Sequence, residues 1–333
     1  MEPSHRRLST LLCALALLCG TAAAQTPQFD AWFDADDFGA IEREAARLLA
    51  RDPADRAALL ARARLALADS DGSRVGAGIA AMEHCLKLSE RDAECHLSLG
   101  SLYGRKAIEA GMVSGLRYAG RIREHFERAV ALAPTSIRAR YRLHQFYIMA
   151  PSIAGGGKTR ARESIEAFAR LSPAQAPLLR AQLDLAEERP AEAGATLLGY
   201  AGGIENGADL VWREQLSSLG FMHLSAKPPR LADAQRVFEF AAARFPRDEL
   251  FQRGLGRIAQ EQGRYAVAAA HFETALAIRP QPGAHYRLAQ VAEKLGDAAR
   301  AIQHYEKTLR FSRGVPRSAL TDANERLKAL RPQ

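Results

Sequence analysis

The sequence has few aromatic residues and no run of alternating apolar and polar residues that would indicate a β-strand. Phe, Tyr and Trp make up 7% of the 333 residues, and 25% of the residues are charged. Strands favour β-branched and aromatic residues, whereas the Ala and Leu that are abundant here favour helices. These shortages exclude a sheet-based domain, and the composition predicts an all-α protein.

Long apolar segments are also missing beyond the N-terminus. The one apolar run, residues 11–19, follows two arginines and precedes three small residues that end at Ala24. This order is typical of a secretory signal peptide, and the run is shorter than the roughly 20 residues that span a bilayer. We therefore expect residues 1–24 to be a signal peptide cleaved after Ala24, and the mature chain, residues 25–333, to have no transmembrane segment.

A cleaved signal peptide predicts that the mature chain is a periplasmic protein of a bacterium. Two alternatives are a secreted protein and a protein anchored to the membrane by a lipid on Cys19. The lipid anchor ranks lower because Leu18, which precedes that cysteine, is larger than the small residue usual at such a site.

Cysteine is scarce, with four in the whole chain. Two lie in the expected signal peptide, so the mature chain keeps Cys85 and Cys95, and an even pair in an oxidising compartment favours a disulfide. The two cysteines lie at similar distances from a turn expected around Glu90, so antiparallel helices would place them face to face. We predict a Cys85–Cys95 disulfide. The alternative is two small buried residues with free thiols.

In its last third the chain contains a recurring set of small and aromatic residues. Ala234 returns as Ala268 and Ala301, at intervals of 34 and 33 residues. An aromatic residue follows each alanine after four positions, and a small residue follows after three more. Residues with this spacing share one face of a helix, where small residues let a second helix approach and the ring fills the gap. A period of 33 or 34 residues indicates stacked helical hairpins.

The recurring set resembles the tetratricopeptide repeat family. The best copy lies between Glu249 and Pro280, and its matching residues are Leu255, Gly256, Gly263, Tyr265, Ala268, Phe272, Ala275 and Pro280. Looser copies extend over most of the chain, with the weakest match between Pro177 and Gly202. The resemblance implies a right-handed α-solenoid of stacked antiparallel helix hairpins, continuous over residues 25–333, whose first helices line a concave groove.

Three segments depart from the regular repeat. Long turns within successive hairpins are expected near 104–121 and 150–158, on the same edge of the array. They would form a partly apolar protrusion that contacts a partner; the alternative is longer helices with a relaxed connection. A short amphipathic helix near 318–330 is expected to cap the last repeat, because the end of a solenoid exposes apolar surface.

The resemblance implies a binding protein without catalytic residues or cofactors. Its partner would be a protein or peptide, acidic or with an exposed carboxylate, because the chain carries a formal net charge of +8. Contact with an anionic envelope surface is a further expectation, whereas nucleic acid is not expected in that compartment. Arg253 and Arg257 lie one helical turn apart and could hold a carboxylate together. The residues expected to face the groove are Arg138, Tyr141, Gln145, Arg253, Arg257, Tyr286, Gln290 and Lys294.

Two motifs would instead support an enzyme or a ligand-binding protein. The glycine-rich loop 155–159 ends like a nucleotide-binding P-loop, but it lacks the first glycine and a preceding strand. The four residues His84, Cys85, Cys95 and His96 offer metal ligands, but adjacent residues of a helix point about 100° apart. No nucleophile, base and orienting group occur in a recognisable arrangement, so we predict a protein that is not an enzyme.

Overall fold

In a computed structural model, residues 26–35, 37–69, 72–311 and 315–331 are described, and none of them forms a β-strand. The expected signal peptide, with Cys19, lies outside these residues. The helices are α1 (Thr26–Asp34), α2 (Phe38–Arg51), α3 (Arg56–Ala68), α4 (Val75–Leu88), α5 (Ala93–Glu109), α6 (Gly111–Gly115), η1 (Leu116–Tyr118), α7 (Ala119–Leu132), α8 (Ile137–Met149), η2 (Ser152–Ala154), α9 (Lys158–Ala169), α10 (Ala176–Ala186), α11 (Pro190–Leu198), η3 (Glu205–Gly207), α12 (Ala208–Ser225), α13 (Leu231–Arg244), α14 (Glu249–Glu261), α15 (Tyr265–Ile278), α16 (Pro282–Lys294), α17 (Ala298–Arg310) and α18 (Arg317–Leu330).

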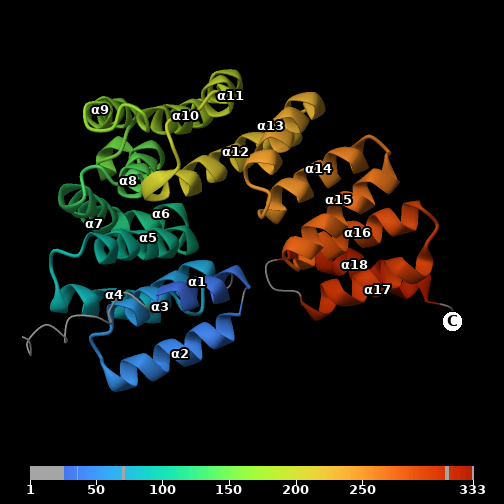
Figure 1. The fold of residues 1–333 in the computed structure, drawn as a ribbon, viewed down its shortest axis with the longest axis horizontal. Coiled ribbons are helices and arrows are strands. Elements are labelled where there is room, and N and C mark those ends of the chain that lie inside the picture. The colour runs from blue at the N-terminus through green and yellow to red at the C-terminus, as the bar shows by residue number, and fades with distance from the viewer. Residues whose placement is uncertain (1–25, 36, 70–71, 312–314, 332–333) are drawn as a thin grey trace, which may run out of the picture.

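The helices form stacked antiparallel hairpins, each packed against the next along the chain (Figure 1). The first helices of successive hairpins, α3, α5, α8, α10, α12, α14 and α16, also contact one another, whereas among the second helices such contacts are found between α11 and α13. Helices on the inside of a bend touch and those on the outside spread apart, so the first helices form the inner face. The prediction of an all-α helical-repeat solenoid is confirmed.

The recurring small and aromatic residues pack the interior of each hairpin. Phe238, Phe272 and Tyr305 are completely buried. A Cβ atom placed on Gly256 would come within 2.7 Å of the ring of Phe272, so the glycine is what lets α14 and α15 approach. The repeat motif therefore consists of residues that hold helix to helix, and partner-binding residues have to be sought on other faces.

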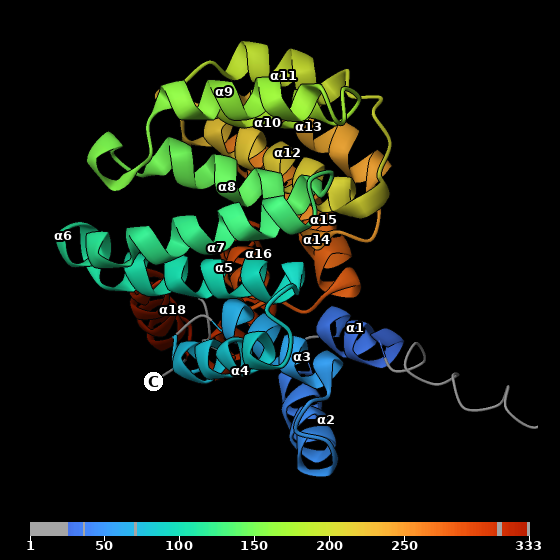
Figure 2. The same ribbon diagram turned by 90° about the vertical axis from the view of Figure 1, so that its left-hand side faces the viewer.

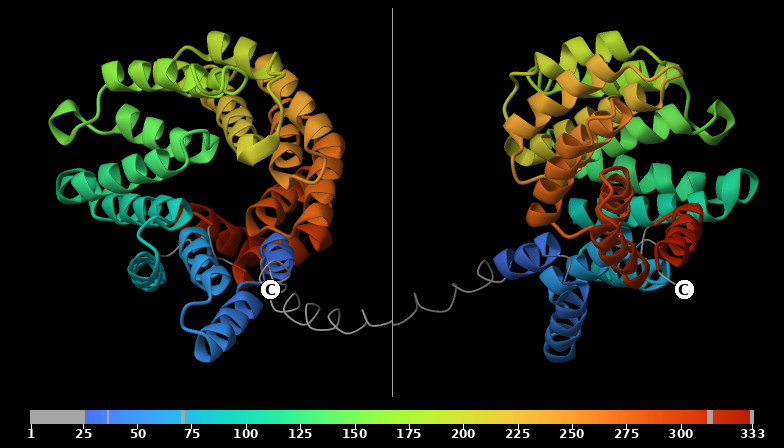
Figure 3. Two further views of the ribbon diagram at one scale, coloured as in Figure 1. Left: turned by 60° about the vertical axis from the view of Figure 1, so that its left-hand side comes forward. Right: turned by 90° about the vertical axis from the view of Figure 1, so that its right-hand side faces the viewer.

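The array curves until its first and last helices come close to each other (Figures 1 and 3). Its last helix, α18, begins at Arg317 and packs on α17, with Ala323 and Leu327 buried against it. None of the described helices is both long and apolar enough to cross a membrane.

The segment expected to be a long turn, 104–121, is mostly helical. Helix α5 continues to Glu109, α6 and η1 follow, and α7 begins at Ala119. The chain reverses at Gly111, whose φ of 78° suits glycine. Tyr118 then stacks on Tyr103, with ring centroids 6.2 Å apart, and fixes the extended tip. The boundaries that we expected for this turn were too wide, because α5 is a longer helix than the repeat period suggests.

The second long turn joins α8 to α9, and the amides of its glycines are hydrogen-bonded within the turn. The amide of Gly155 donates to the carbonyl of Ser152, that of Gly156 to Pro151, and that of Gly157 to Tyr147. A P-loop uses such amides to hold phosphates after a buried strand, but these amides are engaged and helix α8 precedes them. The geometry of this loop therefore gives the nucleotide-binding alternative no support.

A disulfide joins Cys85 at the end of α4 to Cys95 near the start of α5, with 6.3 Å between their Cα atoms. Both residues are buried. The carboxylate of Asp92 accepts hydrogen bonds from the amides of Glu94 and Cys95 and so fixes the first turn of α5. The structure thus contains the disulfide that the cysteine count and spacing predicted.

Candidate functional site

Three arginines from two consecutive first helices gather on the inner face. Arg253 and Arg257 lie on α14, and Arg287 lies on α16, close enough that its positive charge acts on both. Arg253 reaches toward the first turn of α16, where its Nη2 lies 3.6 Å from the position of a Cβ on Gly283. We call Arg253, Arg257 and Arg287 the arginine cluster.

No salt bridge joins an acid to the arginine cluster within the described part of the chain. Glu249 and Glu261 lie one turn from Arg253 and Arg257 on α14, but neither forms a salt bridge with them. Burial lowers the pKa of Arg253 and Arg257, and the charge of Arg287 lowers both pKa values further, while Glu249 and Glu261 oppose the shift. Guanidinium groups nevertheless stay protonated at neutral pH. The three guanidinium groups therefore repel one another and have no salt-bridge partner, so an anionic group placed among them would stabilise the cluster.

The floor of the cluster is aromatic and polar. The guanidinium carbon of Arg257 lies 5.5 Å from the ring centre of Phe221 on α12, while the Nε of Arg257 is buried with no hydrogen-bond partner among the described residues. Arg287 donates to Oε1 of Gln290 at 3.4 Å. Helices α14 and α16 thus supply partly desolvated guanidinium groups to one surface, and α12 supplies the ring beneath one of them, an arrangement suited to a carboxylate.

The predicted site residues on α8 have partners within the chain. Arg138 forms a salt bridge with Glu94 at 2.9 Å, and Gln145 accepts a hydrogen bond from Arg142 at 2.9 Å. Tyr141 is 4% exposed and belongs to the core, with its hydroxyl donating to Glu214. Its placement in the groove is corrected: on a curved array this face of α8 packs on α12, which buries the ring.

The predicted residues on α16 lie at the edge of the arginine cluster. Tyr286 donates to Asp322 of α18 at 2.7 Å and accepts from Gln290 at 2.9 Å. Lys294 is exposed at the end of the helix. The sequence reasoning missed Arg287, because the equivalent position in the preceding repeat is Gly254, which packs on Phe238.

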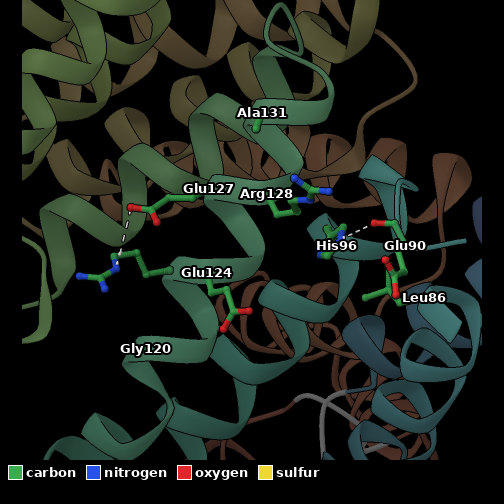
Figure 4. Close-up of a pocket in the computed structure, with 9 residues that line it drawn as sticks. Leu86, Glu90, His96, Gly120, Glu124, Glu127, Arg128 and Ala131 are labelled. Carbon is green, nitrogen blue, oxygen red and sulfur yellow. Dashed lines mark hydrogen bonds and ion pairs between the residues drawn. The ribbon is translucent and has the colours of Figure 1, made fainter.

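A pocket of about 790 Å³ lies elsewhere, between α4, α5 and α7 (Figure 4). Glu90 and His96 line one side, and Glu124, Glu127 and Arg128 line the other. His96 engages the carbonyl of Glu90 through Nε2 at 3.0 Å. No residue predicted to bind a partner lines this pocket, and it holds no cysteine or serine nucleophile.

The proposed metal ligands do not converge. The Cys85 and Cys95 sulfurs are consumed by the disulfide. His84 contacts the carbonyl of Pro53, and Nδ1 of His96 lies 3.0 Å from Nδ1 of His125. Cys85, Asp92 and Cys95 are the one group of three possible ligands close together in the described residues. Because bonded sulfurs are poor metal ligands, the four-residue metal site is wrong.

The repeats in the last third of the chain match a known family. Residues 230–283 and 255–316 match the tetratricopeptide repeat family, and no curated protein matches the sequence. Similar structures include a chain of the APC/C hetero-tetramer Cut9–Hcn1, with 14% identity and a TM-score of 0.43 over 92% of this chain and 55% of that one. Our chain thus spans about half the length of that relative.

Two bacterial structures are similar over nearly their whole length. A tetratricopeptide repeat protein from Parabacteroides merdae has 14% identity and a TM-score of 0.41, over 91% of this chain and 96% of that one. The pilF protein of Pseudomonas aeruginosa has 14% identity and a TM-score of 0.45, over 71% of this chain and 99% of that one. Likeness at this level carries no argument about partners.

Proposed function

This chain is a tetratricopeptide repeat protein, and we propose that it is a non-catalytic binding module that holds an acidic protein or peptide segment on its inner face. The arginine cluster carries the proposal. Three guanidinium groups lie together on this surface, none of them in a salt bridge within the described residues, and Arg257 lies over the ring of Phe221. A carboxylate is the protein group that pairs best with such planar donors.

The partly buried position of the cluster increases the gain from binding. Charges near a low-dielectric interior attract an opposite charge more strongly than charges in bulk water. The candidate residues on α8, whose arginines are already paired with Glu94 and Glu214, would contribute less. We therefore place the acidic part of the partner over α14 and α16.

Anisotropy of a fluorescent hexaglutamate peptide tests this proposal, with hexaglutamine as the neutral probe. We expect the mature chain to bind the acidic peptide, and the triple variant Arg253→Gln, Arg257→Gln, Arg287→Gln to bind it at least about tenfold more weakly. The matched control, Arg236→Gln, Arg247→Gln, Arg310→Gln, removes the same charge from outward positions. Equal losses in both variants would show general attraction by net charge and contradict the proposed site.

We also propose that the mature chain works in the periplasm of a bacterium after cleavage behind Ala24. The leader sequence and the Cys85–Cys95 disulfide support this location, since disulfides persist in oxidising compartments. Sequencing the N-terminus of the chain recovered from a periplasmic fraction should give Gln25. Recovery of the uncleaved chain from the cytoplasm would refute the proposed location.

A further inference from the structure

Five large apolar side chains project from two neighbouring hairpin tips. They are Ile108, Val113 and Leu116 around α6, and Met149 and Ile153 between α8 and α9; their exposed fractions are 69%, 84%, 44%, 66% and 93%. Both tips extend from the same edge of the array (Figures 2 and 3). We call these five residues the apolar edge.

The residues beneath the apolar edge are well packed, so this exposure belongs to the tips alone. Tyr118 stacks on Tyr103, and Ala154 packs on the neighbouring core. The tips protrude as convex turns at the end of their hairpins (Figure 2). Protein hot spots are typically Trp, Tyr and Arg in well-packed pockets, with Leu and Val under-represented. Protruding Ile, Val and Met side chains suit a soft apolar phase better than a second rigid surface.

Positive charge surrounds the apolar edge. Residues 105–123 and 149–160 contain seven Lys and Arg and one acidic residue, Glu109. The acid already pairs with Arg105 at 2.7 Å. Lys106, Arg117 and Arg160 are exposed and join no ion pair within the described part of the chain. The edge therefore combines apolar side chains with unneutralised cations beside them.

We propose that the apolar edge inserts into the surface of an anionic lipid bilayer. The aliphatic side chains enter the boundary between headgroups and acyl chains, where burial of apolar area stabilises binding. Lys106, Arg117 and Arg160 contact lipid phosphates, and their aliphatic stems extend along the apolar surface. Nζ of Lys106 and the guanidinium carbon of Arg117 lie 5.9 and 4.9 Å from the ring centre of Tyr118. An amphipathic ring of this kind suits the interface.

The proposal is independent of the arginine cluster. The apolar edge lies at the ends of α5 and α8, on α6 and η1, and in the turn after α8, whereas the cluster lies on α14 and α16. Membrane contact at one edge leaves the inner face accessible to a partner. A surface-bound module of this kind needs no membrane-spanning helix.

Co-sedimentation with vesicles rich in phosphatidylglycerol tests the proposal, with phosphatidylcholine vesicles for comparison. We expect the mature chain to bind the anionic vesicles and to be released by salt. The variant Val113→Asp, Ile153→Asp should bind about tenfold or more weakly, because charges replace inserting side chains. In the matched control, Leu210→Asp, Val267→Asp, two apolar residues that are 43% and 41% exposed on α12 and α15 are changed, and binding should persist.

Two further variants distinguish vesicle binding at the apolar edge from vesicle binding by the arginine cluster. Lys106→Gln, Arg117→Gln should weaken binding to anionic vesicles, while the triple glutamine variant of the arginine cluster should sediment with vesicles as the parent chain does. Circular dichroism checks that each variant is folded. Lack of vesicle binding at low salt, or equal losses in the edge and control variants, would overturn the proposal. So would a parent dimer that Val113→Asp, Ile153→Asp converts to a monomer without any effect on vesicles, since the edge would then bind a second copy.

Discussion

Nη2 of Arg279 donates a hydrogen bond to the backbone carbonyl of Phe33, 3.3 Å away, although 246 residues separate the two in sequence. Arg279 follows α15, and Phe33 lies in α1, so the first helix of the array rests against one of its last hairpins (Figure 3). A linear solenoid has two free ends, and its repeats contact only their neighbours. In this chain the ends support each other.

The Arg279→Ala variant should loosen α1, which Phe29 and Phe33 still hold by packing on α2 and α3, without unfolding the array. A hydrogen bond from a charged group contributes about 1.5–3 kcal/mol, so amide exchange in residues 26–35 should accelerate about tenfold or more. Hydrogen exchange read by mass spectrometry measures this. Arg247→Ala, in the equivalent connection between α13 and α14, is the control and should leave α1 protected. Unchanged exchange in the Arg279 variant would mean that the contact does not hold the helix.

The disulfide should contribute to stability through the unfolded chain. Cys85 and Cys95 close a loop of 10 residues, for which the loss of chain entropy predicts a contribution of about 2–3 kcal/mol. The free energy of unfolding of the Cys85→Ala, Cys95→Ala variant should be lower by that amount, and its urea midpoint should fall accordingly. After reduction, the stability of the parent chain should approach that of the variant. If reduction leaves the urea midpoint unchanged, the bond adds nothing to the packing of α4 on α5.

Two glycines one turn apart in α5 should respond in opposite directions to alanine. A Cβ on Gly100 would lie 2.7 Å from the ring of Phe126, whereas a Cβ on Gly104 would meet nothing within 4 Å. Gly100→Ala should therefore destabilise the chain by about 1–3 kcal/mol through overpacking. Gly104→Ala should stabilise it by about 0.5–1 kcal/mol through helix propensity. Thermal unfolding of both variants tests the close approach of α5 and α7, and equal shifts would argue against it.

His144 should make the chain sensitive to mild acid. It is completely buried in α8, and burial lowers its pKa from 6.5 to about 4. Below pH 6.5 the unfolded chain takes up a proton that the folded chain does not, so stability is complete above that pH and declines as the pH falls toward 4. This one group should cost about 2 kcal/mol between pH 7 and pH 5.

Urea unfolding at the two pH values measures that loss, and His144→Met should reduce it. The substitution removes the titrating ring and leaves an apolar side chain in its place. His84→Gln, on a partly exposed residue of α4, is the control and should keep the pH dependence of the parent. An unchanged dependence in His144→Met would assign the effect to other groups, of which His304, with a pKa lowered to about 4, is the first to test.

The fold could be predicted from the sequence because its signals are local. Ala, aromatic and Ala at fixed spacing define a helix face, and their return every 33 or 34 residues defines the stack. The disulfide could be predicted because its cysteines flank one short connection. The extent of α5 could not, since its last turns pack against α6 and η1, contacts that no spacing indicates.

Only part of the candidate site could be predicted from the sequence, for a related reason. Arg253 and Arg257 lie one turn apart on a single helix, so their proximity follows from helix geometry. Arg287 and Phe221 join them through the packing of α12, α14 and α16, which depends on crossing angles. The two histidine pairs, His96 with His125 and His285 with His304, likewise form between helices, with Nδ1 atoms 3.0 and 2.9 Å apart.

The disulfide also has a consequence for the fate of a damaged chain. The connection between Cys85 and Cys95 is exposed and contains Lys87 and Arg91, both cleavage sites for trypsin-like proteases. A single cut there would leave the two fragments covalently joined, with α4 still packed on α5. A nicked molecule would keep its inner face and its edge in place. It would separate into two fragments only under reducing conditions.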